Sequence, residues 1–424
     1  MHFNKTDHEH IWHPFSALLP NENLLVKSGN GAEIHLEDGR VLIDAVASWW
    51  VNLFGHANEE LAEVLYKQAQ TLEHVIFAGF THAPATGLVE ELLKIAPVNQ
   101  KRFFFSDNGS TAVEVAVKLA IQYWHNIGQP KTKIVTLEGG YHGDTFGSMS
   151  MAGKSAFFTP FETLLFEVEQ IPFPDEQNKQ NAIQQFEKLV AKKDVAAFVY
   201  EPLVQGSAGM RIYDQEVLAS LVNIAKEHDV LCVADEVMTG FGRTGKYFAS
   251  QHIDTPPDLM AMSKGITGGF MALGVTSCSA QIEEAFLSKD KEKIFYHGHS
   301  YTANALACAV AVRSTQMLQR EETQQNIHRI NGRHLKVAED YRKLAQVKQV
   351  KVQGTILSIE IETGQQSSYF SNIRDVIYNE AIANGILLRP LGNVIYVLPP
   401  YVITDEQLGK VYDFITTLLD KLEQ

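Results

Sequence analysis

The chain has 424 residues, a formal net charge of −14, and 45% hydrophobic and 20% charged residues. This length predicts more than one domain, and the composition is that of an ordinary globular protein. Because no basic stripe is present, nucleic acid is not an expected partner. No apolar run is long enough to span a bilayer, and the first residues lack the basic start and apolar core of a signal peptide. We therefore expect a cytoplasmic protein without a membrane partner.

The three cysteines are Cys232, Cys278 and Cys308. They are odd in number, widely spaced and set in apolar stretches, so we expect neither a disulfide framework nor a metal site. They are predicted to be small buried side chains.

The first predicted element is a hairpin over residues 30–46, which alternate in strand fashion around Asp38-Gly39. From Leu61 onward, apolar runs typical of strands alternate with segments of helical period. The helices are predicted at about 61–72, 113–124 and 216–228, and the strands at 102–106, 133–137, 195–201, 230–235 and 272–277. Continuous apolar strands separated by helices indicate an α/β fold with a mostly parallel sheet covered on both faces.

The C-terminal part has a different pattern. Long helices are predicted from about residue 310, followed by short strands at 386–389 and 394–398. A last helix is predicted to start at Thr404, which has capping-box spacing with Gln407. We therefore expect a large central domain, residues 50–305, and a smaller α+β domain formed by both termini, residues 1–49 and 306–424.

Four segments with polar side chains follow predicted strands, where open α/β sheets bind ligands. The first contains Gly109, Ser110 and Thr111 at the start of a helix. A glycine allows a phosphate to approach the backbone, and free amides at a helix start attract anions. Thr111 and Glu114 have capping-box spacing. The alternative is a capped helix without a ligand.

The second segment places Tyr141 after a strand and a Gly-Gly turn. Its ring could cover a flat heterocycle, although a tyrosine packed in the core is the alternative. The third ends an apolar strand at Asp235, a carboxylate that needs a partner when it is desolvated. An aspartate facing a pyridine nitrogen would keep that nitrogen protonated, whereas an aspartate capping a loop is the alternative.

The fourth segment places Lys264 after the apolar run Leu259–Met262, which we expect to be buried. Burial lowers the pKa of a lysine and makes its amine a nucleophile, whereas a surface lysine is the alternative. A phosphate site, a ring cover, a partner for a ring nitrogen and a reactive lysine are together what pyridoxal 5′-phosphate (PLP) requires. Their order along the chain predicts a PLP site.

Several segments resemble the class III aminotransferases of PLP fold type I over nearly the whole chain. The segments that carry this resemblance are Glu201-Pro202, Gly209-Met210, Ala234-Asp235-Glu236, Gly240 to Gly245 and Ser263 to Gly269. The resemblance implies a large domain around a mostly parallel seven-stranded sheet, a smaller α+β domain and a homodimer with shared active sites.

A second set of segments is similar to one branch of that family. These segments are Ile11 to Pro14, Ala47 to Trp50, Gly79 to Pro84, Gly140 to Thr145 and Leu388 to Gly392. The similarity implies transfer of an amino group from S-adenosylmethionine to the small keto acid 7-keto-8-aminopelargonate, a step of biotin biosynthesis.

The resemblance also implies roles for individual residues. Lys264 holds PLP and, with Asp235 and Tyr141, carries the chemistry: Asp235 pairs with the ring nitrogen and Tyr141 lines the ring and the substrate. Gly109 and Ser110 bind the phosphate.

Further implied residues come from both ends of the chain. His299 and Ser300, with Gly298, reach the phosphate of the partner subunit's cofactor. The implied substrate pocket contains Phe15, Trp49, Tyr141, Lys264, Gly298 and Arg389. An arginine fork suits a carboxylate because it offers paired donors. The alternatives are core packing for Trp49 and a surface ion pair for Arg389.

Two positions differ from the enzymes that use S-adenosylmethionine. These commonly have tyrosine where Phe15 stands and Gly-Pro-Thr where Gly298-His299-Ser300 stand. Both positions are closer to enzymes that take the amino group from lysine, whereas the Trp-His-Pro and Trp-Trp segments favour S-adenosylmethionine. The donor therefore stays open between the two, with S-adenosylmethionine ahead.

Three other functions are compatible with parts of this sequence. Another class III aminotransferase would act on an ω-amino acid such as ornithine. A non-catalytic PLP-fold binding protein is disfavoured because Lys264 and Asp235 are both present. A nicotinamide oxidoreductase should have its glycine-rich loop after the first strand, whereas Gly240 to Gly245 follow the strand that ends at Asp235.

Overall fold

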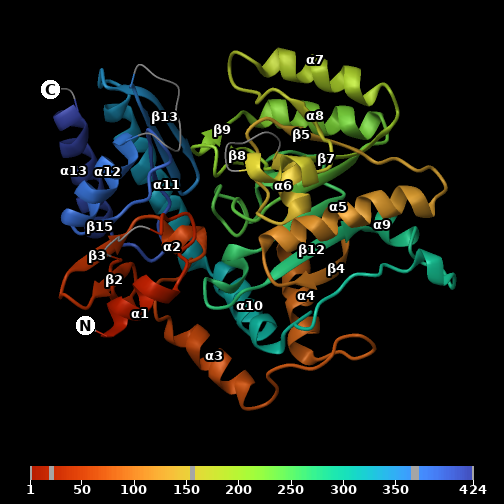
Figure 1. Cartoon of the computed structure of the whole chain (residues 1–424), viewed down its shortest axis with the longest axis horizontal. Helices are drawn as coiled ribbons and strands as arrows, with labels where there is room; N and C mark the ends of the chain where they lie inside the picture. Colours follow the sequence, from red (N-terminus) through yellow and green to blue (C-terminus); the bar gives the residue numbers. More distant parts are fainter. Residues whose placement is uncertain (1, 19–22, 153–157, 364–371, 423–424) are drawn as a thin grey trace.

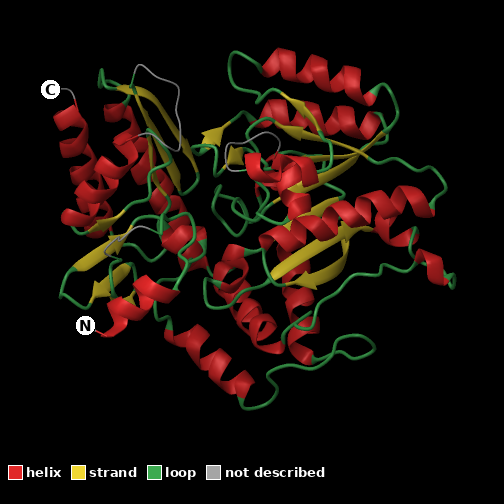
Figure 2. Cartoon of the chain, viewed as in Figure 1, coloured by secondary structure: helices red, strands yellow, loops and turns green. Residues whose placement is uncertain are grey.

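The computed structural model describes residues 2–18, 23–152, 158–363 and 372–422. A seven-stranded sheet forms its centre (Figures 1 and 2). In spatial order the strands are β4 (Gln100–Ser106), β12 (Gly274–Ser279), β11 (Leu259–Met262), β10 (Leu231–Asp235), β7 (Val195–Tyr200), β5 (Lys133–Leu137) and β6 (Glu169–Ile171). Only β12 runs antiparallel to its neighbours, so the mixed α/β fold with a mostly parallel seven-stranded sheet is confirmed.

Helices cover both faces of this sheet. The helix α5 (Gly109–Asn126) packs across one face, where Leu231 and Val233 belong to its cluster of buried side chains. Cys232 and Ala234 point to the other face, on which α8 (Gln215–Glu227) packs. The other helices of this part are α3 (Glu59–Ala69), α4 (Ala83–Ile95), α6 (Phe146–Ala152), α7 (Lys179–Val190), α9 (Ala280–Glu284) and α10 (Ala305–Leu318). The strands β7, β10 and β11 are therefore buried on both faces, which explains their continuous apolar runs.

Segments from both ends of the chain lie side by side, as the red and blue elements of Figure 1 show. One sheet has the order β1 (Val26–Asn30), β2 (Glu33–Leu36), β3 (Val41–Asp44) and β15 (Ile386–Leu387), and another has β13 (Val347–Gln353), β14 (Ile356–Ile361) and β16 (Val394–Val397). The helices here are α1 (His2–His10), α2 (Ala47–Trp50), α11 (Glu321–Tyr341), α12 (Asn372–Ala383) and α13 (Asp405–Leu422). The parallel pairing of β15 with β3 joins the two ends. Domain boundaries at residues 50 and 305 stay a prediction.

Short elements connect these layers. They are the hairpin β8 (Val204–Gln205) with β9 (Arg211–Ile212), and the 3-10 helices η1 (Thr159–Leu164), η2 (Ala249–His252), η3 (Lys264–Thr267) and η4 (Lys291–Lys293). No helix among the described residues has the length and apolar composition to cross a membrane.

Local predictions agree with the structure in several places. The hairpin around Asp38-Gly39 forms as β2 and β3. At α13, Thr404 and Gln407 exchange the predicted capping hydrogen bonds, at 3.0 and 3.1 Å. All three cysteines are buried and free.

Two local predictions are wrong. The region after residue 310 contains the strands β13 and β14 as well as long helices. Polar residues alternate along β13, and its half-exposed position hides the apolar signal of a strand. The cap of α5 is also different: Asn108 rather than Thr111 is the N-cap, and Thr111 is the third helical residue of the capping box.

Candidate active site

A cavity of about 890 Å³ lies at the carboxyl ends of the parallel strands, beside the segments from the two ends of the chain. Eight predicted site residues line it: Phe15, Trp49, Gly109, Ser110, Tyr141, Asp235, Lys264 and Arg389. The cavity is where open α/β sheets bind ligands. Gly298, His299 and Ser300 do not line it.

The start of α5 forms one wall of the cavity. Asn108 accepts a hydrogen bond from the Thr111 N–H at 3.0 Å, which fixes the first turn of the helix. A Cβ atom on Gly109 would lie 2.6 Å from Cγ1 of Val237, so only glycine fits there without displacement. Glu114 does not cap the helix and instead accepts from the Thr145 hydroxyl at 2.6 Å. Asn108, Gly109 and Ser110 line the cavity, so this helix start lies where an anion site requires it.

The hydroxyl of Ser110 is held in place from the neighbouring loop. Its Oγ lies 2.7 Å from the Thr145 Oγ1, and it accepts from the Thr145 N–H at 3.1 Å. Since Glu114 binds Thr145 in turn, a chain of hydrogen bonds orients Ser110 at the cavity wall.

Asp235 ends β10 and is 4% exposed. Its carboxylate accepts from the His142 Nδ1–H at 2.7 Å and from the Val237 N–H at 3.1 Å. Burial lowers the pKa of His142, but the hydrogen bond to Asp235 and the charges of Asp235 and Glu201 outweigh it and raise this pKa above its ordinary value. A buried anion at the cavity wall is suited to pair with a protonated ring nitrogen.

Lys264 follows β11 and begins η3. Burial lowers the pKa of its amine to about 8, although the charges of Asp235 and Glu201 act in the opposite direction. Its Nζ lies 4.4 Å from the centre of the Trp50 ring. A lysine that loses its proton this easily is a nucleophile near neutral pH.

Glu201 is a residue of the cavity to which the sequence analysis gave no role. It follows β7, the strand next to β10, and its carboxyl accepts from the Tyr141 N–H at 3.0 Å and the Gly206 N–H at 2.9 Å. Burial raises its pKa to about 7, the charge of His142 lowers it, and that of Asp235 raises it. The signal was a carboxylate after an apolar strand, the same signal that identified Asp235.

Tyr141 lies between these groups and the outer cavity. Its ring packs on Met149 and Phe158. Burial raises the pKa of its hydroxyl well above the ordinary value, and the charge of Asp144 and a hydrogen bond to it add to this shift. The phenol therefore stays neutral at physiological pH, and because it donates its one proton to Asp144, its oxygen is left to accept a hydrogen bond from a ligand.

The outer part of the cavity contains three predicted substrate residues. The Phe15 and Trp49 rings meet edge to face, with centroids 5.6 Å apart. The guanidinium carbon of Arg389 lies 4.5 Å from the Trp49 ring centre, and no ion pair joins Arg389 to an acid of the described chain. A half-buried cation on an aromatic wall can bind the carboxylate at the end of an apolar ligand.

The segment with Gly298, His299 and Ser300 lies away from this cavity, against the loop before α4. The His74 Nε2 lies 2.5 Å from the Ser300 carbonyl, and the His82 Nε2 lies 2.8 Å from the Ala303 carbonyl. The Nε2 of His299 is buried and has no hydrogen-bond partner among the described residues. One chain alone therefore does not bring these residues to its own cavity.

The residues of the cavity fit PLP. Gly109 lines the cavity at a helix start where a Cβ atom would clash with Val237, the Asp235 carboxylate is buried at the wall, and the Lys264 amine is easily deprotonated. These are the groups needed for a phosphate, a pyridine nitrogen and an aldehyde.

The model of the family "Aminotransferase class-III" matches residues 18–419, and the chain belongs to this family. Among individual relatives, an adenosylmethionine-8-amino-7-oxononanoate aminotransferase of Synechococcus elongatus is 46% identical over 424 residues, which cover 98% of this chain and 99% of that relative.

Two solved structures show the same fold. The aminotransferase of that name from Methanocaldococcus jannaschii has a TM-score of 0.93 and 32% identity, covering 99% of this chain and 98% of its own. A PLP-bound amine transaminase from an uncultivated Pseudomonas species has a TM-score of 0.91 and 27% identity, covering 97% and 99%. The fold is therefore that of the PLP-dependent aminotransferases.

Proposed function

We propose that this chain uses PLP to transfer an amino group from S-adenosylmethionine to 8-amino-7-oxononanoate, also called 7-keto-8-aminopelargonate, in biotin biosynthesis. The names of the relatives support this substrate pair. One observation carries the proposal: Arg389, which has no ion pair with any described residue, lies on Trp49 in the same cavity as Lys264 and Asp235. A long acid with a keto group near its far end needs both features.

The residues at the inner end of the cavity have separate roles in binding the cofactor and moving protons. Lys264 holds the cofactor and then moves a proton, for which a pKa near 8 is suited. Asp235 holds a proton on the ring nitrogen, and His142 orients its carboxylate. When bound, PLP supplies the electron sink that lets an amino group leave one carbon and join another. Gly109 and Ser110 hold the phosphate.

The residues at the outer end of the cavity bind and orient the keto acid. Arg389 pairs with the carboxylate of the keto acid, and Trp49 and Phe15 cover its apolar chain. Tyr141 lines the reacting end, where its hydroxyl oxygen can accept a hydrogen bond. Because donor and acceptor carry carboxylates and react at the same lysine, they occupy the cavity in turn.

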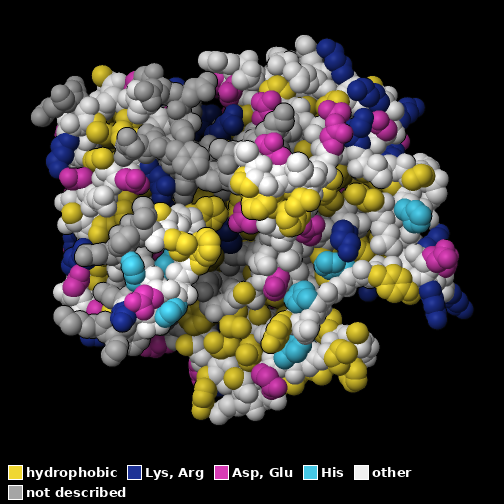
Figure 3. All heavy atoms as spheres, in the orientation of Figure 1, with side chains coloured by type: hydrophobic (Ala, Val, Ile, Leu, Met, Phe, Trp, Pro, Cys, Tyr) yellow, Lys and Arg dark blue, Asp and Glu magenta, His cyan; other side chains and the backbone are white. Residues whose placement is uncertain are grey.

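The working unit is a homodimer in this proposal. His299 and Ser300 lie outside the chain's own cavity, and Ser300 is exposed, so a second subunit can reach it. Figure 3 shows hydrophobic side chains gathered over α3 and α4 on the lower part of the molecule, where Tyr66, Ile76 and Phe80 are more than half exposed. An apolar surface of this kind marks an interaction site. The cytoplasmic location stays a prediction.

A donor screen tests the proposed activity. The purified protein is incubated with PLP, 8-amino-7-oxononanoate and one donor, either S-adenosylmethionine, lysine or glutamate, and the diamino product is measured by mass spectrometry. The product should form with S-adenosylmethionine and not with a Lys264→Ala variant. If the product forms with lysine and not with S-adenosylmethionine, lysine is the amino donor. Turnover of ω-amino acids with 2-oxoglutarate, and none of this acceptor, would overturn the proposal.

A further inference from the structure

The residues Ala47–Trp50 form a left-handed helical turn at the edge of the cavity. Their φ angles are 49°, 46°, 71° and 74°. The turn is closed by hydrogen bonds from the Trp50 N–H to the Val46 carbonyl, at 2.9 Å, and from the Val51 N–H to the Ala47 carbonyl, at 3.0 Å. In this conformation the Cβ atom of each residue comes too close to the next carbonyl, and none of the four is glycine. The surroundings must therefore hold the turn in place.

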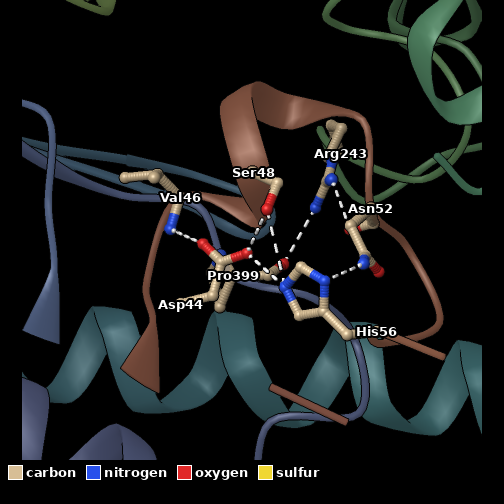
Figure 4. A network of polar contacts seen from close by, with 7 residues as sticks. All are labelled: Asp44, Val46, Ser48, Asn52, His56, Arg243 and Pro399. Atoms are coloured by element: carbon tan, nitrogen blue, oxygen red, sulfur yellow. Dashed lines mark hydrogen bonds and ion pairs between the residues drawn. The ribbon is translucent and has the colours of Figure 1, made fainter. Parts of the chain in front are cut away.

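A buried carboxylate holds the first half of this turn (Figure 4). Asp44 ends β3 and is completely buried. Its Oδ1 accepts from the Val46 N–H at 3.1 Å, and its Oδ2 accepts from the Ser48 hydroxyl at 3.0 Å and from His56 Nε2 at 2.9 Å. Asp44 thus binds the residue before the turn and a residue within it.

His56 is itself fixed by the hairpin of β1 and β2. Its N–H donates to the Gly31 carbonyl at 2.7 Å and its carbonyl accepts from the Gly31 N–H at 3.2 Å. A Cβ atom on Gly29 would lie only 2.6 Å from the His56 Cβ, so the backbone of β1 packs directly on this histidine. Asn52 donates to its Nδ1 at 3.3 Å, so Nε2 carries the proton given to Asp44.

The second half of the turn is held from another side. Arg243 is 1% exposed and donates to the Asn52 carbonyl at 3.1 Å (Figure 4). It also donates to the Trp50 carbonyl at 3.2 Å. The turn is therefore tied at both ends, by a carboxylate before it and a guanidinium after it.

The turn presents two aromatic rings to the cavity. Trp49 lies under the guanidinium of Arg389, and Trp50 lies under the amine of Lys264 while its Nε1–H donates to the Tyr396 hydroxyl at 3.1 Å. In a right-handed or extended backbone, the two neighbouring side chains would point in other directions.

We propose that Asp44 and His56 are positioning residues of the substrate site, which act by holding the left-handed turn Ala47–Trp50 so that Trp49 faces the substrate. Neither side chain lines the cavity. The inference rests on the proposed function for the choice of the acceptor acid.

Three variants test the role of the turn. His56→Leu removes the donor to Asp44 and should raise KM for 8-amino-7-oxononanoate roughly 10- to 100-fold, because small displacements of positioning groups have effects of this size. The value of kcat at saturation should change less, and PLP should stay bound. Ser48→Ala removes a single hydroxyl from the turn and should act in the same direction, so it carries the test if His56→Leu does not fold. Adding Ala47→Gly to either variant should lower the raised KM, since glycine adopts positive φ without steric cost.

His334→Leu is the matched control. His334 lies on α11, is completely buried and hydrogen bonded to the Thr355 carbonyl and the Tyr412 hydroxyl, and does not line the cavity. Its replacement should lower Tm and leave KM unchanged. If His56→Leu and Ser48→Ala leave KM unchanged, or if glycine at residue 47 does not lower a raised KM, the proposal is wrong.

A structural measurement separates this inference from the proposed function, because it needs no substrate. In a crystal structure of the Ser48→Ala or His56→Leu holoenzyme, residues 48 and 49 should leave the positive φ region or Trp49 should move away from Arg389. An unchanged turn and an unchanged Trp49 would overturn the inference even if the acceptor acid is a substrate.

Discussion

The chemistry of Lys264 depends on its burial and on three nearby charges. Burial lowers its pKa to about 8, the charges of Asp235 and Glu201 oppose this change, and that of Arg243 adds to it. The sequence shows a lysine after an apolar strand, but the balance of these effects depends on side chains that follow β10 and β7.

This balance predicts how the amine reacts as pH changes. In the cofactor-free chain, a small neutral acylating reagent should modify Lys264 with a midpoint near pH 8, because only the deprotonated amine reacts. Asp235→Asn should move the midpoint lower, since it removes a negative charge that raises the pKa of Lys264. Mass spectrometry of the modified peptide measures both midpoints. Lys410, whose pKa Glu406 raises, is the internal control and should react only at higher pH. A Lys264 midpoint above pH 10 would contradict this account.

Asp235→Asn also tests the role of this carboxylate. We expect kcat/KM to fall by at least about 100-fold, equivalent to about 2.7 kcal/mol, because a neutral amide cannot keep the ring nitrogen protonated. Asp258→Asn is the control: Asp258 is equally buried and accepts from Lys226 and the Cys232 N–H, at the opposite end of the strands. It should lower Tm and leave turnover near normal. Near-normal turnover of Asp235→Asn would show that this carboxylate does not face the ring.

Arg389→Ala should damage the half-reaction with the keto acid most. Since Arg389 is half-buried, the loss of one charged hydrogen-bond partner should cost about 1.5–3 kcal/mol, roughly 10- to 150-fold in single-turnover kcat/KM. Arg313→Ala, which removes an arginine paired with Glu60 away from the cavity, should have no such effect. Equal losses in both half-reactions would mean that Arg389 binds both substrates, and no loss in either would place the substrate elsewhere.

Among the helices, α5 and α13 begin with the same kind of capping box but differ in what the capped first turn does. Asn108 caps α5 beside the cavity, and Thr404 caps α13 far from it. Both fix a first turn, but only the start of α5 lines the cavity.

This pair allows a comparison of stability with cofactor binding. Asn108→Ala and Thr404→Ala should each cost about 1 kcal/mol of stability. Only Asn108→Ala should also weaken PLP binding, because the amides around Gly109 lose their fixed direction. Thermal unfolding and titration of the cofactor-free protein with PLP measure the two effects. If both variants bind PLP with equal affinity, the start of α5 does not bind the phosphate of PLP.

The position of residues 298–300 decides whether one chain by itself forms a complete active site. They lie against the loop with His74 and outside the cavity. If they complete the partner's site, each site of the homodimer needs both chains.

Hybrid dimers test this arrangement. A Lys264→Ala chain and a Ser300→Asp chain, each inactive as a homodimer because of a missing amine or an added negative charge near the phosphate, should regain about a quarter of wild-type activity when unfolded and refolded together in equal amounts. Half of the dimers are then hybrids, and each has one intact site. Sedimentation should show a dimer in every case. A mixture without regained activity would contradict shared sites.

Sequence by itself determined much of this protein. Continuous apolar strands separated by amphipathic helices are possible only in a covered, mostly parallel sheet, so local pattern fixed the central architecture. Asp235, Lys264 and Gly109 were identified because each follows a strand, and strand ends meet at one edge of the sheet. The strand β13 was not predicted, because its partly exposed position allows polar residues that interrupt the apolar pattern of a strand.

Only the tertiary structure decided the rest. The left-handed turn Ala47–Trp50 contains no glycine from which the sequence could predict it. Residues distant in the chain hold it in place instead. The lowered pKa of Lys264 and the raised pKa of Glu201 come from burial and from charges on neighbouring strands. Such effects depend on distances between residues far apart in sequence, which local periodicity does not encode.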